Sequence, residues 1–131
     1  MNNALSVVQR MLGAFGAGNM EELKSTLADT TMWVYHGTAD IPYAGTYVGK
    51  DEVVRFIGTI MAHTSIEGFA ADTFLADGEK VVVLGSEKQR IKKNGQLLQQ
   101  RWVQVYTVKD HLITHMDEFA NTAHAAKLFT A

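Results

Sequence analysis

The feature that most constrains this chain is a series of extended segments in its C-terminal half, separated by short turn signals. Apolar and polar residues alternate there with a period of two, as on strands that have two different faces. The predicted strands are Glu67–Ala76, Lys80–Lys93, Leu97–Val108 and His111–Phe119. Asp77-Gly78 and Asn94-Gly95 favour tight hairpin turns, and Lys109-Asp110-His111 is a plausible third turn. The pattern therefore predicts a four-stranded antiparallel meander.

The N-terminal half has the period of helices instead. The first apolar stripe contains Leu5, Val8, Leu12 and Phe15, with Met11 beside it. Asn19 followed by Glu22 has the spacing of a capping box and predicts a second, short helix. A third helix is expected after Lys50-Asp51, since Val53, Phe56, Ile57, Ile60 and Met61 recur at helical spacing.

Three further segments complete the expected fold. Residues 31–36 alternate as a strand, residues 44–48 form a possible short strand, and residues 121–129 form a terminal helix that begins at Asn121. The chain has 131 residues, which fits one domain, residues 1–131. The order of elements predicts an α+β fold, with helices first and a meander sheet after them.

The composition excludes several classes of function. A formal net charge of −2 gives no electrostatic reason to bind nucleic acid or an anionic membrane. The absence of cysteine removes disulfides and thiolate metal sites. His111 and His115 have the spacing of a helical metal pair, but on a strand they lie ~13 Å apart, so no metal site is expected. We find neither a secretory signal nor an apolar stretch long enough to span a membrane, and we expect a cytoplasmic protein.

The hairpin turns decide which side chains share a face of the sheet. A two-residue turn at Asn94-Gly95 pairs Lys93 with Gln96, and a three-residue loop ending at His111 pairs Val108 with Leu112. One face then contains Glu87, Trp102, Gln104, Tyr106, Met116 and Glu118. A two-residue turn before Leu112 would slip the last strand by one residue and exchange Glu118 for Asp117. The sequence leaves both registers open.

The mixed aromatic and polar face is the best candidate for a small-molecule site. Its expected ligand-binding residues are Trp33, Tyr35, Phe56, Trp102, Tyr106 and Met116. Either Glu118 or Asp117 would be buried near Trp102, where desolvation raises the pKa of a carboxyl group and allows proton transfer near neutral pH. The alternative is that these aromatic residues only form a core or a subunit interface.

Both faces of the predicted sheet are rich in apolar residues, so both need to be covered. In a chain of this length the helices can cover one side only. We therefore expect a homodimer that forms through the outer face of the sheet.

Three segments carry a resemblance to a known family. They are MWVYHG…AGTYVGKDEVVRFI (residues 32–57), LADGEKVVVLG (residues 75–85) and RWVQVYTVKDHLITHMDEF (residues 101–119). They resemble SnoaL-like proteins of the nuclear-transport-factor-2-like, ketosteroid-isomerase-like superfamily. The resemblance implies a cone-like fold, in which a strongly curved, mostly antiparallel sheet wraps around the N-terminal helices and encloses an apolar cavity.

The same resemblance implies a function and roles for two residues. It implies an isomerase, cyclase or dehydratase that acts without metal or organic cofactor, by proton transfer on an apolar or cyclic small molecule. Glu118 falls at the position of the acid/base carboxylate, and Gln104 falls where the cyclases have a histidine. Glutamine cannot accept and return a proton as histidine can. The alternative is a non-catalytic domain of the same fold that binds a small hydrophobic ligand or serves as a scaffold.

Overall fold

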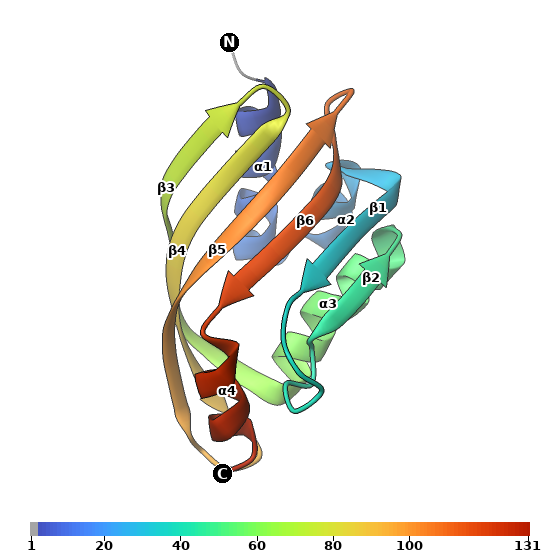
Figure 1. The fold of residues 1–131 in the computed structure, drawn as a ribbon. Coiled ribbons are helices and arrows are strands. Elements are labelled where there is room, and N and C mark those ends of the chain that lie inside the picture. The colour runs from blue at the N-terminus through green and yellow to red at the C-terminus, as the bar shows by residue number, and fades with distance from the viewer. Residues whose placement is uncertain (1–2) are drawn as a thin grey trace.

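The computed structural model describes residues 3–131, which form four helices and six strands (Figure 1). The helices are α1 (Asn3–Ala17), α2 (Met20–Ser25), α3 (Lys50–His63) and α4 (Thr122–Phe129). The strands are β1 (Leu27–Tyr35), β2 (Gly45–Val48), β3 (Thr64–Asp77), β4 (Lys80–Ile91), β5 (Leu97–Lys109) and β6 (Leu112–Ala120).

The strands form one curled sheet that does not close, in the order β2-β1-β6-β5-β4-β3. β1 lies parallel to β6, and the other neighbouring strands are antiparallel. In Figure 1 the helices α1, α2 and α3 all lie behind the sheet, so its other face is free of them. The α+β class is confirmed, as is the packing of the N-terminal helices within a curved, mostly antiparallel sheet.

The N-terminal helices form largely as the sequence predicts. α1 turns Val8 and Met11 into the core, whereas Leu12 and Phe15 are only partly buried. The Asn19 side chain accepts a hydrogen bond from the backbone N–H of Glu22, at 3.1 Å, as expected of the cap of α2. β1 begins four residues earlier than expected, at Leu27.

The β4–β5 hairpin has a longer loop than predicted. Ile91 instead of Lys93 is the last residue to pair with Gln96, through a 2.8 Å bond from the Ile91 N–H to the Gln96 carbonyl. The loop therefore spans residues 92–95, and Gly95 adopts the left-handed conformation with φ 72°. The predicted register was wrong by two residues, which is a whole period of the strand, so every side chain keeps its predicted face.

The β5–β6 hairpin combines a shorter turn with a bulge. Its turn has two residues, Asp110 and His111, both with positive φ, and the expected three-residue loop is wrong. That turn alone would have put Asp117 inside. However, the pairing shifts by one further residue between Thr107 and Val108, so that Gln104 lies opposite Glu118. Pairing Val108 with Leu112 would have placed Gln104 opposite Met116. The predicted register was therefore wrong by two residues, a whole period of the strand, and Glu118 keeps its predicted face.

Candidate functional site

A cavity lies between the inner face of the sheet and helices α1 and α3. About 50 Å³ of it is open to the centres of water molecules. Its walls are Met11, Leu12, Phe15, Trp33, Phe56, Ile57, Ile60, Ile66, Phe69, Glu87, Gln89, Gln104, Tyr106 and Glu118. A single water needs roughly 10–15 Å³ on this measure, so the cavity suits a compact ligand. Two carboxyl groups lie among these walls, and no lysine, arginine or histidine does.

Glu118 is the more deeply buried of the two acids. The residue is 7% exposed, near the end of β6. The Gln104 amide donates a hydrogen bond from Nε2 to Oε1 of Glu118, at 3.0 Å. Among the described residues nothing donates to the other oxygen, Oε2. The carboxyl group therefore has one oxygen held by the protein and one available to a ligand.

Tyr106 fixes the orientation of the Gln104 amide. Its hydroxyl donates to Oε1 of Gln104 at 2.6 Å, so that the NH₂ end of the amide is left to face Glu118. The order Tyr106–Gln104–Glu118 thus forms a buried chain of donors and acceptors across β5 and β6.

The environment of Glu118 favours its protonated form. Burial, and after it the negative charge of Glu87, raise the pKa of its carboxyl group to about 8, although the hydrogen bond from Gln104 opposes both effects. A carboxyl group with such a pKa exchanges between acid and base forms near neutral pH, which general acid–base chemistry requires.

Glu87, on β4, is the second acid of the cavity. Its Oε2 accepts a 2.6 Å hydrogen bond from Nε2 of Gln100, on β5. Burial raises the pKa of Glu87, and the bond from Gln100 opposes this. The alternation of the strands had put Glu87 on the face of Glu118, yet sequence reasoning gave it no role in the site.

Aromatic side chains form the apolar walls. Trp33 packs edge-on against Tyr106 and Phe56, with ring centroids 6.1 and 6.3 Å apart. These three residues were expected at a ligand site, and the structure brings them together around the cavity. Sequence reasoning missed the walls contributed by α1 and β3, because no signal in the sequence says where a helix crosses a sheet.

Three other expected ligand residues lie in the core and do not line the cavity. Trp102 and Met116 are each 1% exposed. Trp102 stacks on Phe69, which does line the cavity, at a centroid distance of 5.1 Å. Tyr35 packs against Tyr43, with ring centroids 5.1 Å apart. These three side chains belong to the core around the site and are not part of its walls.

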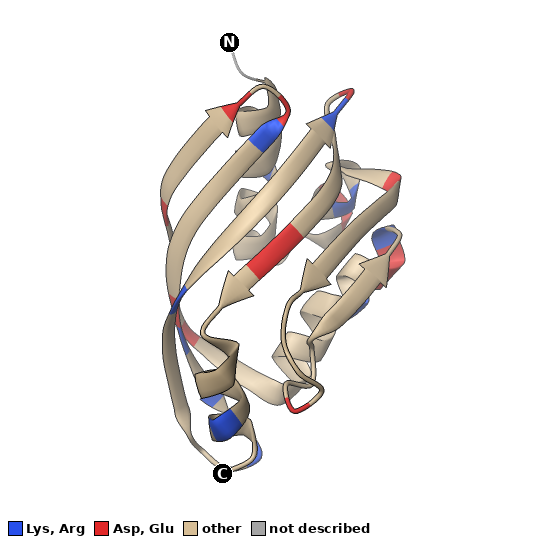
Figure 2. Cartoon of the chain, in the orientation of Figure 1, with Lys and Arg blue, Asp and Glu red and all other residues tan. Residues whose placement is uncertain are grey.

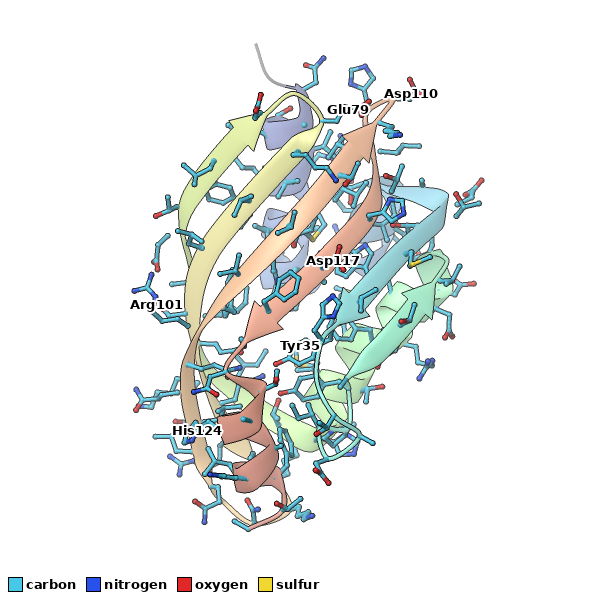
Figure 3. The ribbon with its side chains drawn as sticks, viewed as in Figure 1. Tyr35, Glu79, Arg101, Asp110, Asp117 and His124 are labelled. Carbon is cyan, nitrogen blue, oxygen red and sulfur yellow. The ribbon has the colours of Figure 1, made fainter. Side chains whose placement is uncertain are left out.

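Asp117 points away from the cavity. Its Oδ1 lies 2.8 Å from Nε2 of His36, and the two side chains are about half exposed. Figure 3 shows Asp117 on β6, on the face of the sheet turned away from the helices. The register differs from both that the sequence left open, but it buries Glu118, as the three-residue loop would have done, and leaves Asp117 outside.

The structure describes residues 3–131, and two kinds of feature are absent within that range. No group of three or more histidine, aspartate or glutamate side chains is placed to hold a metal ion in this part of the chain. Over the same range, no helix is long and apolar enough to cross a membrane.

Comparison with solved structures shows the same architecture in other proteins. A nuclear-transport-factor-2-like protein of unknown function from Burkholderia pseudomallei is 27% identical, with a TM-score of 0.89 and full coverage of both chains. One from Burkholderia xenovorans is 24% identical, with a TM-score of 0.89 over 97% of this chain and 95% of the other. A candidate SnoaL-like polyketide cyclase from Jannaschia is 15% identical, with a TM-score of 0.81 over 98% and 92%.

Sequence comparison identifies the family. No curated protein matches the chain. The sequence model of the SnoaL-like domain, however, matches residues 8–116, from the middle of α1 to the centre of β6. That range includes β3, β4, β5 and the first half of β6, and every residue of the cavity walls except Glu118. The chain therefore belongs to the SnoaL-like domain family.

Proposed function

We propose that this protein is an enzyme of the isomerase, cyclase or dehydratase type, which moves a proton on an apolar or cyclic small molecule bound in the cavity. The observation that carries the proposal is the state of Glu118. It is buried among aromatic walls, its pKa is raised to about 8, and one of its oxygens is free to meet a ligand. The fold likeness to a candidate polyketide cyclase agrees with this class of reaction.

The proposed chemistry needs only residues of the cavity. In its ionised form, Glu118 accepts a proton from a carbon next to a carbonyl group through Oε2. The electron pair of the C–H bond forms the double bond of an enolate, and Glu118 then returns the proton to another atom of the ligand. Gln104 holds the carboxylate by its hydrogen bond and does not itself carry the proton.

The second candidate is a domain that binds a small hydrophobic ligand, or serves as a scaffold, without turnover. The replacement of a histidine by Gln104 favours it, because the site then lacks a second group that can exchange a proton near neutral pH. Catalysis and ligand binding both need an open cavity and differ only in whether the bound molecule reacts, whereas a scaffold needs no bound molecule.

Exchange of hydrogen for deuterium distinguishes the two candidates. A panel of small cyclic ketones and enones is incubated with the protein in D₂O, and deuterium beside the carbonyl group is followed by NMR. We expect the wild-type protein to accelerate the exchange of at least one member. Glu118→Gln should lower that rate by about 10²–10⁴-fold, since it keeps the shape of the side chain but cannot move a proton.

The matched control is Asp117→Asn, the same chemical change one residue away on the opposite face of the sheet. It should leave the rate of exchange unchanged. If Glu118→Gln retains the rate within a few-fold, Glu118 is not the acid/base. If ligands bind but none exchanges, the non-catalytic candidate is correct.

A further inference from the structure

The charge of the cavity is entirely negative. Glu87 and Glu118 reach it from β4 and β6, and no cationic side chain is among its described walls. Their nearest polar partners are the neutral amides of Gln100 and Gln104. Exposed acids of the same chain do have cations beside them, as in the pair Arg90–Glu67, at 3.0 Å. Glu118, which is buried, and Glu87, which is half-buried, thus have no counter-charge among the described walls of the cavity.

Buried carboxylates without a counter-charge are costly, and they reduce the cost by keeping a proton. A ligand that brings a positive charge supplies the missing partner and allows both acids to ionise. A ligand that brings a negative charge adds repulsion in a medium that screens it poorly. The two acids therefore favour a ligand with a positive charge and disfavour one with a negative charge.

The rest of the cavity suits an organic cation. Phe15, Trp33, Phe56, Phe69 and Tyr106 surround the acids, and aromatic ring faces attract ammonium groups in addition to burying an apolar body. Among the described residues, no three histidine, aspartate or glutamate side chains lie together as a metal site would need. The small open volume favours a body about the size of a single ring.

We propose that the ligand of this cavity is a compact apolar molecule with a protonated amine, and that the ammonium group lies beside Glu87 and Glu118. This inference rests on the proposed function only in taking the cavity as the binding site. It adds the chemical class of the substrate. It also has a consequence for the reaction, because an ammonium group beside Glu118 stabilises the ionised form, which is the form that accepts a proton.

Three probes of matched shape test the charge. Benzylamine, benzyl alcohol and benzoate share one ring and differ in being positive, neutral and negative at pH 7.5. Binding is followed by NMR on protein with ¹³C-labelled methionine methyl groups. Met11 lines the cavity, and Met61, which is 41% exposed, reports contacts outside it. We expect benzylamine to shift Met11 with a Kd about tenfold or more below that of benzyl alcohol, and benzoate not to shift it.

Variants of the two acids test whether they cause the tighter binding of benzylamine relative to benzyl alcohol. The double change Glu87→Gln and Glu118→Gln should bring the Kd of benzylamine to within about twofold of that of benzyl alcohol, while the alcohol binds as before. Asp117→Asn removes one charge from the opposite face and should keep the full preference. Binding of the alcohol by the double variant shows that its cavity is still formed.

The failures of the two proposals can be told apart. If benzyl alcohol shifts Met11 and benzylamine binds no tighter, the amine inference is wrong and the proposed function stands. If the preference for benzylamine survives the double change, the two acids do not cause it and the inference is likewise wrong. If no probe shifts Met11, the cavity is not a binding site, and both proposals fall.

Discussion

Glu118 makes the stability of the protein depend on pH in the direction opposite to that of an ordinary acid. Its pKa is raised from 4.5 to about 8 by burial and by Glu87, so the folded chain holds a proton that the unfolded chain has released. This contribution to stability is fully present below about pH 4.5 and is lost as the pH rises to about 8. The loss approaches about 1.4 kcal/mol for each pH unit in this window.

Glu118→Gln should therefore gain stability relative to the wild type as the pH rises. At pH 5 the two free energies of unfolding should be close, because a protonated glutamate and a glutamine are similar in shape and charge. At pH 8 the variant should be the more stable. Urea denaturation at pH 5, 6.5 and 8 measures the difference, and a constant difference across this range would contradict the raised pKa.

Glu87→Gln tests the coupling of the two acids directly. It removes a negative charge from the cavity, so the pKa of Glu118 should fall. The ¹³C signal of the Glu118 carboxyl group, assigned by its absence in Glu118→Gln, gives the pKa by titration. Glu79→Gln is the control, because Glu79 lies at the β3–β4 turn, at one end of the molecule (Figure 3). Equal values in the two variants would show that Glu87 does not act on Glu118.

Among the elements, the hairpins show what a sequence can and cannot specify. Asp110 and His111 occupy the turn where a turn was expected, and the Asn94-Gly95 signal lies within its loop. The loop lengths were wrong in both cases. A change in loop length shifts the register of the strand by whole residues. A shift by an odd number of residues moves every side chain to the other face of the sheet, whereas a shift by an even number leaves each on its own face. The bulge beside Thr107 made the total shift in β6 even, and nothing in the local sequence signals a bulge there.

Gly85, on β4, lies where its neighbours leave no room for a side chain. A Cβ atom on this residue would overlap the Trp102 ring and the carbonyl oxygen of Ala70. The Trp102 ring and the backbone of β3 could make room for a methyl group only if the strands moved apart. Gly85→Ala should therefore lower the free energy of unfolding by about 1–3 kcal/mol.

The matched control for this change lies in α3. A Cβ atom on Gly58 meets nothing within 4 Å, and alanine favours a helix more than glycine does. Gly58→Ala should raise the free energy of unfolding by up to about 1 kcal/mol. Chemical denaturation of both variants measures the contrast, and equal effects would mean that contact with Trp102 does not constrain Gly85.

For the whole molecule, the sequence predicted the class and the curvature of the fold better than the site. Period and turn signals are local, and they were enough to order the elements. The parallel pairing of β1 with β6 joins segments far apart in the chain, and so does the packing of α1 over Glu87. Such pairings depend on tertiary contacts that no short window of sequence contains. This is why Glu118 and Gln104 were found and the wall from α1 was not.

The outer face of the sheet is uncovered by helices and is largely apolar. In Figure 2 much of the ribbon of β4, β5 and β6 carries no charged residue, apart from the strand ends and one segment of β6. Met32 and Phe119 are 37% and 45% exposed on the outer face. Half-buried side chains continue the surface, namely Val82, Leu84, Val103 and Val105. An apolar surface across several neighbouring strands is typical of a subunit interface.

We propose that two copies of the chain associate through this face, and that Phe119 lies in the contact. Light scattering during gel filtration at micromolar concentrations should give the mass of two chains. Phe119→Glu should produce monomers, because it places a charge inside the interface and beside Asp117. Met61→Glu makes the same change at an exposed residue of α3 and should leave the dimer intact. A monomeric wild-type protein would exclude the dimer, and a dimer unaffected by Phe119→Glu would place the contact on another surface.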